Sequence, residues 1–228
     1  MVTLTQSFPP AATREAVARR IEALGALAVV RVQRADDVLP VAQALHAGGV
    51  SAIEVTMTVP GALDAIARLA REAGDDLLVG VGSVLDEDTA RRAVEAGARF
   101  VVSPVFRPLV LQEAQRQGAA ALPGAFTPTE ILRAHEAGAD LVKVFPSDAL
   151  GPSFIKGVRA PMPFLKLCPT GGVTPENAGE WIRAGAAAVG LGSTLVDTRL
   201  VAAGDWPAIT ALARRTAESV AAAHGGAA

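Results

Sequence analysis

A lysine and a glutamate stand at matching places in two similar segments of the chain. Lys143 follows Gly138 by five residues, Glu54 follows Gly49 by five residues, and both lie in apolar runs. If parallel strands carry these runs, both side chains point into the same interior. An amine held there beside a carboxylate suits chemistry that needs an amine nucleophile. The alternative is a buried ion pair with a structural role only.

Lysine is scarce in this chain, which makes Lys143 conspicuous. The chain has three lysines, so 18 of its 21 basic residues are arginines (21 − 3 = 18). Arginine cannot replace a lysine as an amine nucleophile, because its guanidinium stays protonated. A lysine in an apolar strand therefore favours amine chemistry, although it can also extend to a strand end or pair with a buried acid. Lys166 lies near the start of its strand and Lys156 in a helical pattern, so we expect structural or surface roles for both.

Two glycine turns indicate a phosphate site. One predicted strand ends in Cys-Pro-Thr-Gly-Gly at 168–172, and the next ends in Gly-Leu-Gly-Ser at 190–193. Glycine lets backbone N–H groups approach anionic oxygens, and we expect a helix to open after each turn and to add positive potential. The alternative is that these glycines only make tight turns.

Four Ala-Gly segments, at 47–49, 96–97, 137–138 and 184–185, each end an amphipathic run and precede an apolar one. Their spacing indicates a repeated architecture. The apolar runs predict eight strands, and helical patterns lie between them; the predicted strands are 27–32, 51–56, 77–81, 99–103, 119–122, 140–145, 164–168 and 187–191. The fold expected is a (β/α)₈ TIM barrel with an extra N-terminal helix near 12–24. An open doubly wound sheet is the alternative, but the first strand is not followed by Gly-x-Gly-x-x-Gly.

Length and composition limit the remaining choices. We expect one barrel domain over 11–220, with flexible tails at 1–10 and 221–228. A net charge of −2 without a basic run argues against nucleic acid as a partner. The single cysteine and the lack of a signal-like or membrane-spanning segment favour a cytoplasmic location with no membrane partner. Three scattered histidines predict no metal site, and no cofactor is expected.

The chain resembles the bacterial 2-keto-3-deoxy-6-phosphogluconate (KDPG) aldolases, which include 4-hydroxy-2-oxoglutarate (KHG) aldolases. The resemblance runs from about 27 to 196. It depends on ordered motifs, namely Gly-Gly-Val-Ser-Ala-Ile-Glu-Val-Thr at 48–56, Gly-Val-Gly-Ser-Val-Leu at 80–85, Val-Ser-Pro at 102–104, Leu-Pro-Gly at 122–124, Lys-Val-Phe-Pro at 143–146 and Pro-Thr-Gly-Gly-Val at 169–173.

The resemblance implies a role for each matching residue. Lys143 would form the Schiff base and Glu54 would be the acid–base. The substrate's pyruvate end would be lined by Ser83, Pro104, Phe145 and Thr170. Its phosphate would be held by Gly171, Gly172, Gly192 and Ser193. The family also suggests a homotrimer.

The chain departs from the family pattern in its carboxylate-binding residue. Some members carry arginine where this chain has Thr58, and threonine where it has Ser83. Other members carry an arginine at the end of strand one, as here in Val-Arg-Val at 30–32. Arg31 is therefore the candidate for binding the substrate carboxylate, because guanidinium suits bidentate carboxylate recognition; a structural ion pair is the alternative.

The expected activity is a class I aldolase reaction that cleaves a phosphorylated 2-keto acid, KDPG, to pyruvate and glyceraldehyde 3-phosphate. It would also cleave 4-hydroxy-2-oxoglutarate to pyruvate and glyoxylate. The first alternative is 2-keto-3-deoxy-6-phosphogalactonate, whose aldolases share the strand-one arginine and the lysine–glutamate pair. A phosphate-binding isomerase or epimerase, and a non-catalytic sensor of sugar phosphates, are the others.

Overall fold

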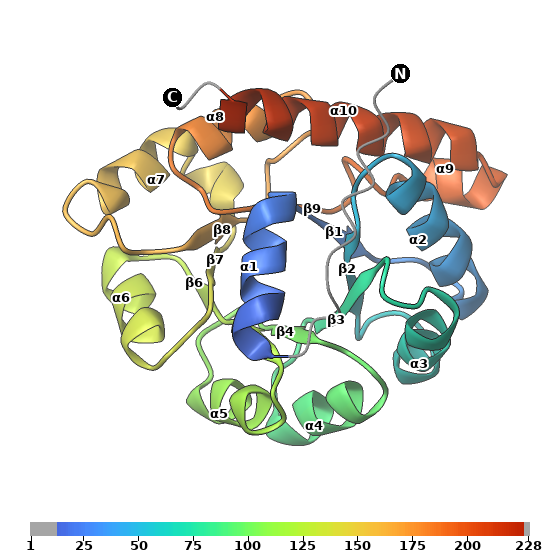
Figure 1. Cartoon of the computed structure of the whole chain (residues 1–228), viewed down its shortest axis with the longest axis horizontal. Coiled ribbons are helices and arrows are strands. Elements are labelled where there is room, and N and C mark those ends of the chain that lie inside the picture. The colour runs from blue at the N-terminus through green and yellow to red at the C-terminus, as the bar shows by residue number, and fades with distance from the viewer. Residues whose placement is uncertain (1–12, 226–228) are drawn as a thin grey trace.

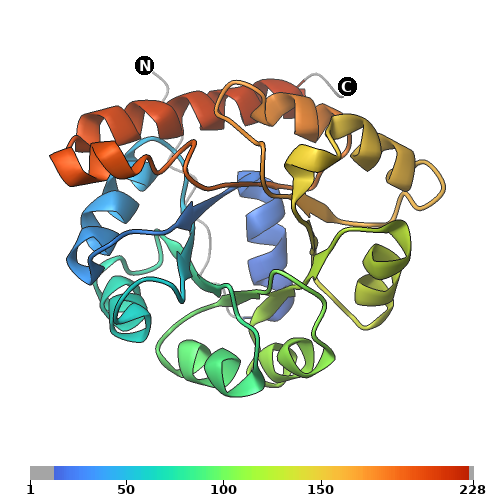
Figure 2. The same cartoon turned by 180° about the vertical axis from the view of Figure 1, so that it is seen from behind.

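The computed structural model describes residues 13–225 and has an α/β fold built on parallel strands. The strands are β1 Ala26–Val30, β2 Ala52–Thr56, β3 Leu78–Gly82, β4 Phe100–Val102, β5 Ala120–Leu122, β6 Gly124–Ala125, β7 Val142–Val144, β8 Leu167–Pro169 and β9 Val189–Leu191. They gather at the centre of the molecule, and most helices are arranged around them (Figures 1 and 2).

The helices mostly fall in the intervals that the sequence pattern predicts. They are α1 Arg14–Leu24, α2 Val38–Ala47, α3 Ala62–Glu72, α4 Glu87–Glu95, α5 Pro108–Arg116, α6 Pro128–Glu136, α7 Pro152–Arg159, α8 Ala178–Arg183, α9 Thr198–Ala203 and α10 Trp206–Gly225, with short 3₁₀ turns η1 Ala35–Asp37 and η2 Ser147–Ala149. No helix within the described residues is long and apolar enough to span a membrane.

The expected single barrel sheet is divided into two parallel sheets. Strands pair in the order β5-β4-β3-β2-β1-β9 in one sheet and β6-β7-β8 in the other. Pro123, which has no N–H to donate, separates β5 from β6, so the strand predicted at 119–122 becomes two short ones. At the other junction, an isolated parallel bridge between Thr170 and Gly190 connects β8 to β9.

Glycines at two helix ends fix where the strands with the candidate residues begin. Gly49 has φ 95° and Gly138 has φ 93°, a left-handed region that favours glycine. The N–H of Gly138 donates to the His135 carbonyl, and the N–H of Gly49 donates to the His46 carbonyl. Equivalent helix ends therefore start β2 and β7 in the same register.

The apolar core has two layers. The larger layer packs the outer faces of the strands against the surrounding helices. The smaller layer fills the space inside the strands, where Leu27, Leu78 and Phe100 meet Val17 and Ile21 of α1. Because Leu27, Leu78 and Phe100 stand at or near the starts of their strands, α1 covers the amino ends. The carboxyl ends therefore face the opposite side of the molecule, towards the viewer in Figure 2.

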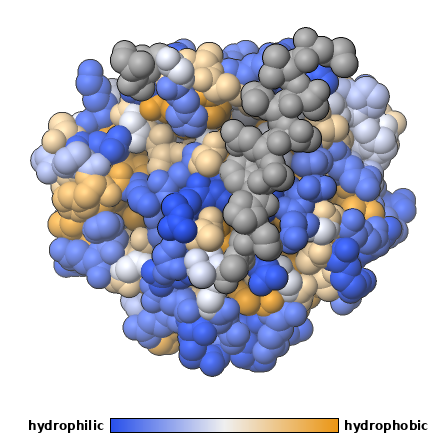
Figure 3. Space-filling model, in the orientation of Figure 1, coloured by the Kyte–Doolittle hydropathy of each residue, from blue (hydrophilic) through white to orange (hydrophobic). Residues whose placement is uncertain are grey.

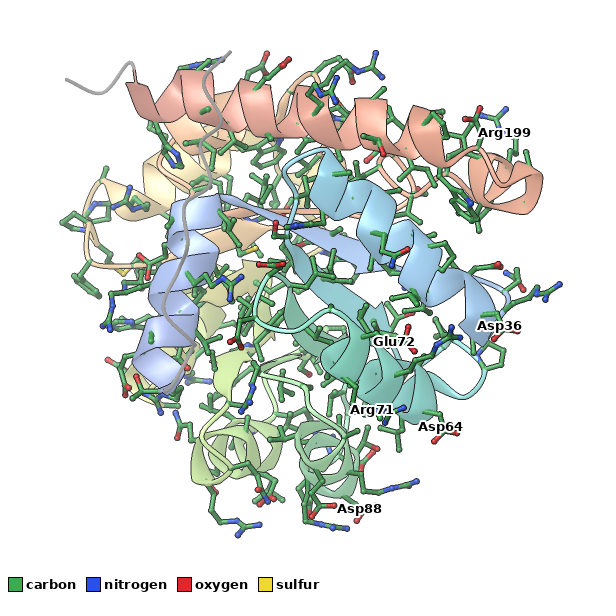
Figure 4. The ribbon with its side chains drawn as sticks, turned by 45° about the vertical axis from the view of Figure 1, so that its right-hand side comes forward. Asp36, Asp64, Arg71, Glu72, Asp88 and Arg199 are labelled. Carbon is green, nitrogen blue, oxygen red and sulfur yellow. The ribbon has the colours of Figure 1, made fainter. Side chains whose placement is uncertain are left out.

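Charged side chains cover the outside. On the face that carries α1, hydrophilic residues surround smaller apolar areas (Figure 3). Charged residues labelled in Figure 4 lie on the outside of η1, α3, α4 and α9; they are Asp36, Asp64, Arg71, Glu72, Asp88 and Arg199.

The expected C-terminal tail at 221–228 is wrong for the part that the structure describes. Helix α10 continues to Gly225, because its last turns are rich in alanine and bury Val220 and Ala223 against the core. The expected tail at 1–10 and the last three residues lie outside the described range.

Candidate active site

Lys143 and Glu54 meet inside the strands, as their register predicts. Lys143 is the central residue of β7, and Glu54 is the central residue of β2. The Lys143 Nζ atom lies 3.9 Å from Glu54 Oε1, and the two side chains are 6% and 1% exposed. An amine and a carboxylate are thus held together where water has little access.

Glu54 lacks the partners that a structural carboxylate usually has. Neither of its buried carboxylate oxygens has a hydrogen-bond partner within residues 13–225. Burial raises the pKa of the Glu54 carboxyl above its ordinary value, although the charges of Lys143 and Arg31 oppose this rise. A carboxyl in this state is suited to taking up and releasing a proton.

Gly82 makes room for the Glu54 carboxylate. Gly82 ends β3 and pairs in register with Thr56 of β2. A Cβ atom added at Gly82 would lie 1.9 Å from Glu54 Oε1, closer than any real contact. The absence of a side chain at position 82 is therefore a requirement of the Glu54 rotamer.

One cavity of about 280 Å³ collects every site residue that the sequence predicted. These residues are Arg31, Glu54, Ser83, Pro104, Lys143, Phe145, Thr170, Gly171, Gly172, Gly192 and Ser193. Almost all of them stand at or just after a strand's carboxyl end, so the sheet order brings them together. The Lys143 amine also lies 5.2 Å from the centre of the Phe145 ring.

Arg31 stands at the rim of this cavity. Arg31 directly follows β1 and is exposed. Among the described residues, no acidic side chain forms an ion pair with it. Nearby, the Thr56 hydroxyl donates to the carbonyl of Val30 and exchanges a 2.8 Å hydrogen bond with the Thr58 hydroxyl. The guanidinium is therefore available to an anionic ligand.

The two glycine turns face the cavity, but neither opens directly into a helix. After the first turn, Thr174 and Asn177 exchange side-chain and backbone hydrogen bonds, and the regular helix α8 begins only at Ala178. After the second turn, α9 begins only at Thr198. The expected positive potential of helix N-termini is thus displaced from both turns.

Free backbone amides provide the anion-binding groups instead. Within residues 13–225, the N–H groups of Gly171, Gly172, Val173, Ser193 and Thr194 donate to no protein acceptor. Gly171 and Gly172 have φ of 99° and 72°, so successive peptides turn their N–H groups in a way that side-chain-bearing residues rarely allow. Amides of this kind form a concave site for an anion.

The other two lysines lie elsewhere, as expected. Lys166 Nζ donates to Glu22 Oε1 of α1 over 2.7 Å, which places Lys166 on the covered side of the strands. Lys156 is exposed on α7.

Sequence reasoning missed part of the cavity lining. The further lining residues are Val29, Val173, Gly190, Thr194, Val196 and Thr198. Val29 stands two residues before Arg31 on one strand, so period-two alternation could have indicated it. Val196 and Thr198 come from the loop after β9, whose path no sequence pattern reveals. Among residues 13–225, no group of three or more His, Cys, Asp or Glu side chains could hold a metal ion.

Comparison with known proteins agrees with this geometry. The family model for KDPG and KHG aldolases matches residues 17–212. The chain is 36% identical to a 2-dehydro-3-deoxy-phosphogluconate aldolase of Treponema pallidum, covering 88% of this chain and 95% of that one. It is also 36% identical to a 2-dehydro-3-deoxy-6-phosphogalactonate aldolase of Escherichia coli, covering 74% and 83%.

A solved structure agrees as well. A KDPG aldolase from Legionella pneumophila, with pyruvate captured as a covalent carbinolamine intermediate, superposes with a TM-score of 0.80 at 31% identity. The superposition covers 89% of this chain and 97% of that chain. By its sequence and its fold, the chain belongs to the KDPG and KHG aldolase family.

Proposed function

We propose that this chain is a class I aldolase that cleaves KDPG to pyruvate and glyceraldehyde 3-phosphate, and 4-hydroxy-2-oxoglutarate to pyruvate and glyoxylate. The observation that carries the proposal is the buried pair of Lys143 Nζ and Glu54 Oε1, 3.9 Å apart in the cavity. Membership of the family supports the reaction class.

The reaction begins at the Lys143 amine. The neutral amine attacks the C2 ketone, and Glu54 protonates the resulting carbinolamine oxygen so that water leaves and an iminium forms. Glu54, now ionised, removes the proton of the C4 hydroxyl. The C3–C4 bond then breaks, its electron pair passes into the iminium to give an enamine, and C4 to C6 leave as the aldehyde. Protonation of the enamine at C3 and addition of water release pyruvate and restore the amine.

The remaining cavity residues hold the two ends of the substrate. Arg31 pairs with the C1 carboxylate, while Ser83, Pro104, Phe145 and Thr170 enclose the pyruvate portion. The phosphate binds at the cavity mouth, where the free N–H groups of Gly171, Gly172 and Ser193 donate to its oxygens. The open space at Gly192 leaves room for it.

Trapping with borohydride and pyruvate tests the nucleophile. Mass spectrometry of the digested adduct should locate the reduced pyruvate on Lys143. Lys143→Arg should give no adduct, whereas Lys166→Arg serves as the matched control and should trap as the wild type does. An adduct on another residue, or none in the wild type, would exclude the mechanism. It would favour an isomerase or epimerase that shares the phosphate-binding turns.

Two observations support a further substrate. Arg31 lines the cavity whereas Thr58 does not. The phosphogalactonate aldolase relative and the phosphogluconate aldolase relative are both 36% identical to this chain. 2-Keto-3-deoxy-6-phosphogalactonate is therefore the alternative substrate. Cleavage rates for the gluconate, galactonate and hydroxyglutarate compounds, measured on one preparation, decide which substrate is preferred.

The two sheets are proposed to act as one closed eight-stranded barrel. At one junction, the Lys143 N–H donates to the Pro123 carbonyl and the Asp140 N–H donates to the Ala121 carbonyl, which joins β7 to the β5–β6 strand. The Thr170–Gly190 bridge joins the other junction. Slow hydrogen exchange at the amides of Lys143 and Asp140 would support closure, and fast exchange would contradict it.

A homotrimer in the cytoplasm is proposed for the assembled enzyme. Exposed apolar side chains follow β3, β4 and β6, whose carboxyl ends surround the cavity: Leu85 at 52%, Val105 at 48%, Leu109 at 56% and Phe126 at 39% exposure. Large exposed apolar side chains gathered at one end of a molecule are typical of a surface that another protein covers.

A further inference from the structure

Three carbonyl groups in and next to the first glycine turn accept hydrogen bonds from other parts of the protein. The Thr170 carbonyl accepts from the Ser147 N–H at 2.9 Å. The Gly172 carbonyl accepts from Asn177 Nδ2 at 3.0 Å, and the Val173 carbonyl accepts from the Thr194 hydroxyl at 2.7 Å. Side chains therefore fasten two of these three peptides.

A hydrogen bond that fixes the direction of a carbonyl group also fixes the direction of the N–H group in the same planar peptide. The peptide between Gly172 and Val173 is trans, so its N–H points away from its C=O. Asn177 holds that C=O and does not line the cavity, whereas Val173 does. Because the Val173 N–H has no protein acceptor within residues 13–225, it is free to donate to an anion bound in the cavity.

The turn needs such fastening because glycine does not restrict it. Gly171 and Gly172 lack the Cβ atoms that would confine their dihedral angles. A rotated peptide would present a carbonyl oxygen to the ligand, and a phosphate would be repelled by that oxygen. The Asn177 carboxamide also accepts from the Thr174 N–H at 2.8 Å, so both of its ends are engaged in the turn.

We infer that Asn177 is a positioning residue for the phosphate end of the substrate. It moves no proton in the aldol cleavage. It keeps the Val173 amide of the turn pointed at the anion. This inference rests on the proposed function, since it concerns the phosphate of the same substrate.

Two variants test the inference in the full chain. Asn177→Asp keeps the acceptor for the Thr174 N–H but loses the donor to the Gly172 carbonyl. Asn177→Ala removes the same donor, together with the acceptor, without adding charge. Glu180→Gln, which changes an exposed residue of the same helix, serves as the control.

Binding of inorganic phosphate, measured by calorimetry, is the first readout because it does not depend on catalysis. Asn177→Asp and Asn177→Ala should weaken phosphate binding about tenfold, the effect of one misplaced hydrogen-bond donor. Glu180→Gln should bind as the wild type does. Unchanged binding in both Asn177→Asp and Asn177→Ala overturns the inference.

Kinetics give the second readout. The same two variants should raise KM for the phosphorylated keto acid by a similar factor and leave borohydride trapping of pyruvate at Lys143 within about twofold. Equal losses with phosphorylated and unphosphorylated substrates would indicate general damage and overturn the inference. If the wild type binds phosphate but traps no pyruvate, the aldolase proposal fails while the phosphate result still decides the role of Asn177.

Discussion

At the scale of single residues, the burial of Glu54 is the feature that connects structure to chemistry. Its two carboxylate oxygens are inaccessible and lack hydrogen-bond partners among the described residues, and the Lys143 amine lies 3.9 Å from Oε1. Removing a carboxylate from water favours its neutral form, and the charges of Lys143 and Arg31 only partly offset that effect. The site therefore holds a carboxyl whose protonation state changes readily.

The pH dependence of catalysis should show this directly. The free enzyme reacts with the Lys143 amine neutral and Glu54 carrying the one proton of the pair, so a second proton on the pair blocks the attack. Burial raises the pKa of the Glu54 carboxyl above the ordinary 4.5. Activity is thus lost on acidification at a higher pH than for an exposed glutamate. We expect the acidic limb of kcat/KM, which reports the free enzyme, to have its midpoint above pH 4.5.

Circular dichroism over the same pH range is the control, because it separates unfolding from protonation. A midpoint at or below 4.5 in a folded enzyme would contradict the assignment.

Gly82 offers a second test at this scale. In Gly82→Ala the new methyl group would collide with Glu54 Oε1, so the carboxylate must move. Displacement of a catalytic group by about 1 Å can reduce the rate on the order of 100-fold. We expect a loss of that size in kcat/KM. Gly157→Ala, at a position with open space around it, should keep full activity. Wild-type kinetics in Gly82→Ala would show that Glu54 is not confined by this contact.

The sequence allowed the lysine–glutamate register to be predicted because it is repeated and local. Gly49 and Gly138 end helices in the same way, so a count of five residues reaches equivalent strand positions. The roles of Gly82 and Asn177 could not be predicted. Both depend on atoms that meet across different elements, and no spacing within one segment records such a contact.

At the scale of elements, two similar start signals behave differently. Thr127 caps α6 with a full capping box, in which its side chain accepts from the Glu130 N–H and Glu130 accepts in return. Thr174 opens the same Thr-Pro pattern and makes a similar exchange, in which it accepts from the Asn177 N–H and Asn177 Oδ1 accepts from the Thr174 N–H. The pattern predicts the start of α6 accurately, whereas the regular helix α8 begins at Ala178, three residues after Pro175.

The α6 cap can be tested by stability. Thr127→Ala removes the capping hydroxyl and should lower the free energy of unfolding by about 1 kcal/mol. Thr129→Ala, inside the same helix and exposed, is the matched control and should change it little. Chemical denaturation of the two variants measures the difference. Equal stabilities would show that Glu130 alone sustains the start of the helix.

At the scale of the whole molecule, the apolar side chains beside the cavity mouth predict the assembly state. Sedimentation equilibrium should give about three times the chain mass of 23.2 kDa. Leu109→Glu places a charge in the apolar area and should shift the mass towards that of one chain. Phe164→Glu, 54% exposed near the start of β8, should leave the mass unchanged. A monomeric wild type, or an unaffected Leu109→Glu, would contradict the trimer or this interface.

The helix α1 that seals the amino ends of the strands also constrains the order of events. With Val17 and Ile21 packed onto Leu27 and Phe100, the interior beneath Lys143 is filled, and the cavity opens at the other side. Substrate entry and product release therefore share one opening. The phosphorylated aldehyde, bound at the cavity mouth, is released first, and pyruvate, bonded to Lys143 at the inner end, is released last. Pyruvate then competes with the incoming keto acid, so the rate of cleavage falls as the surrounding pyruvate concentration rises.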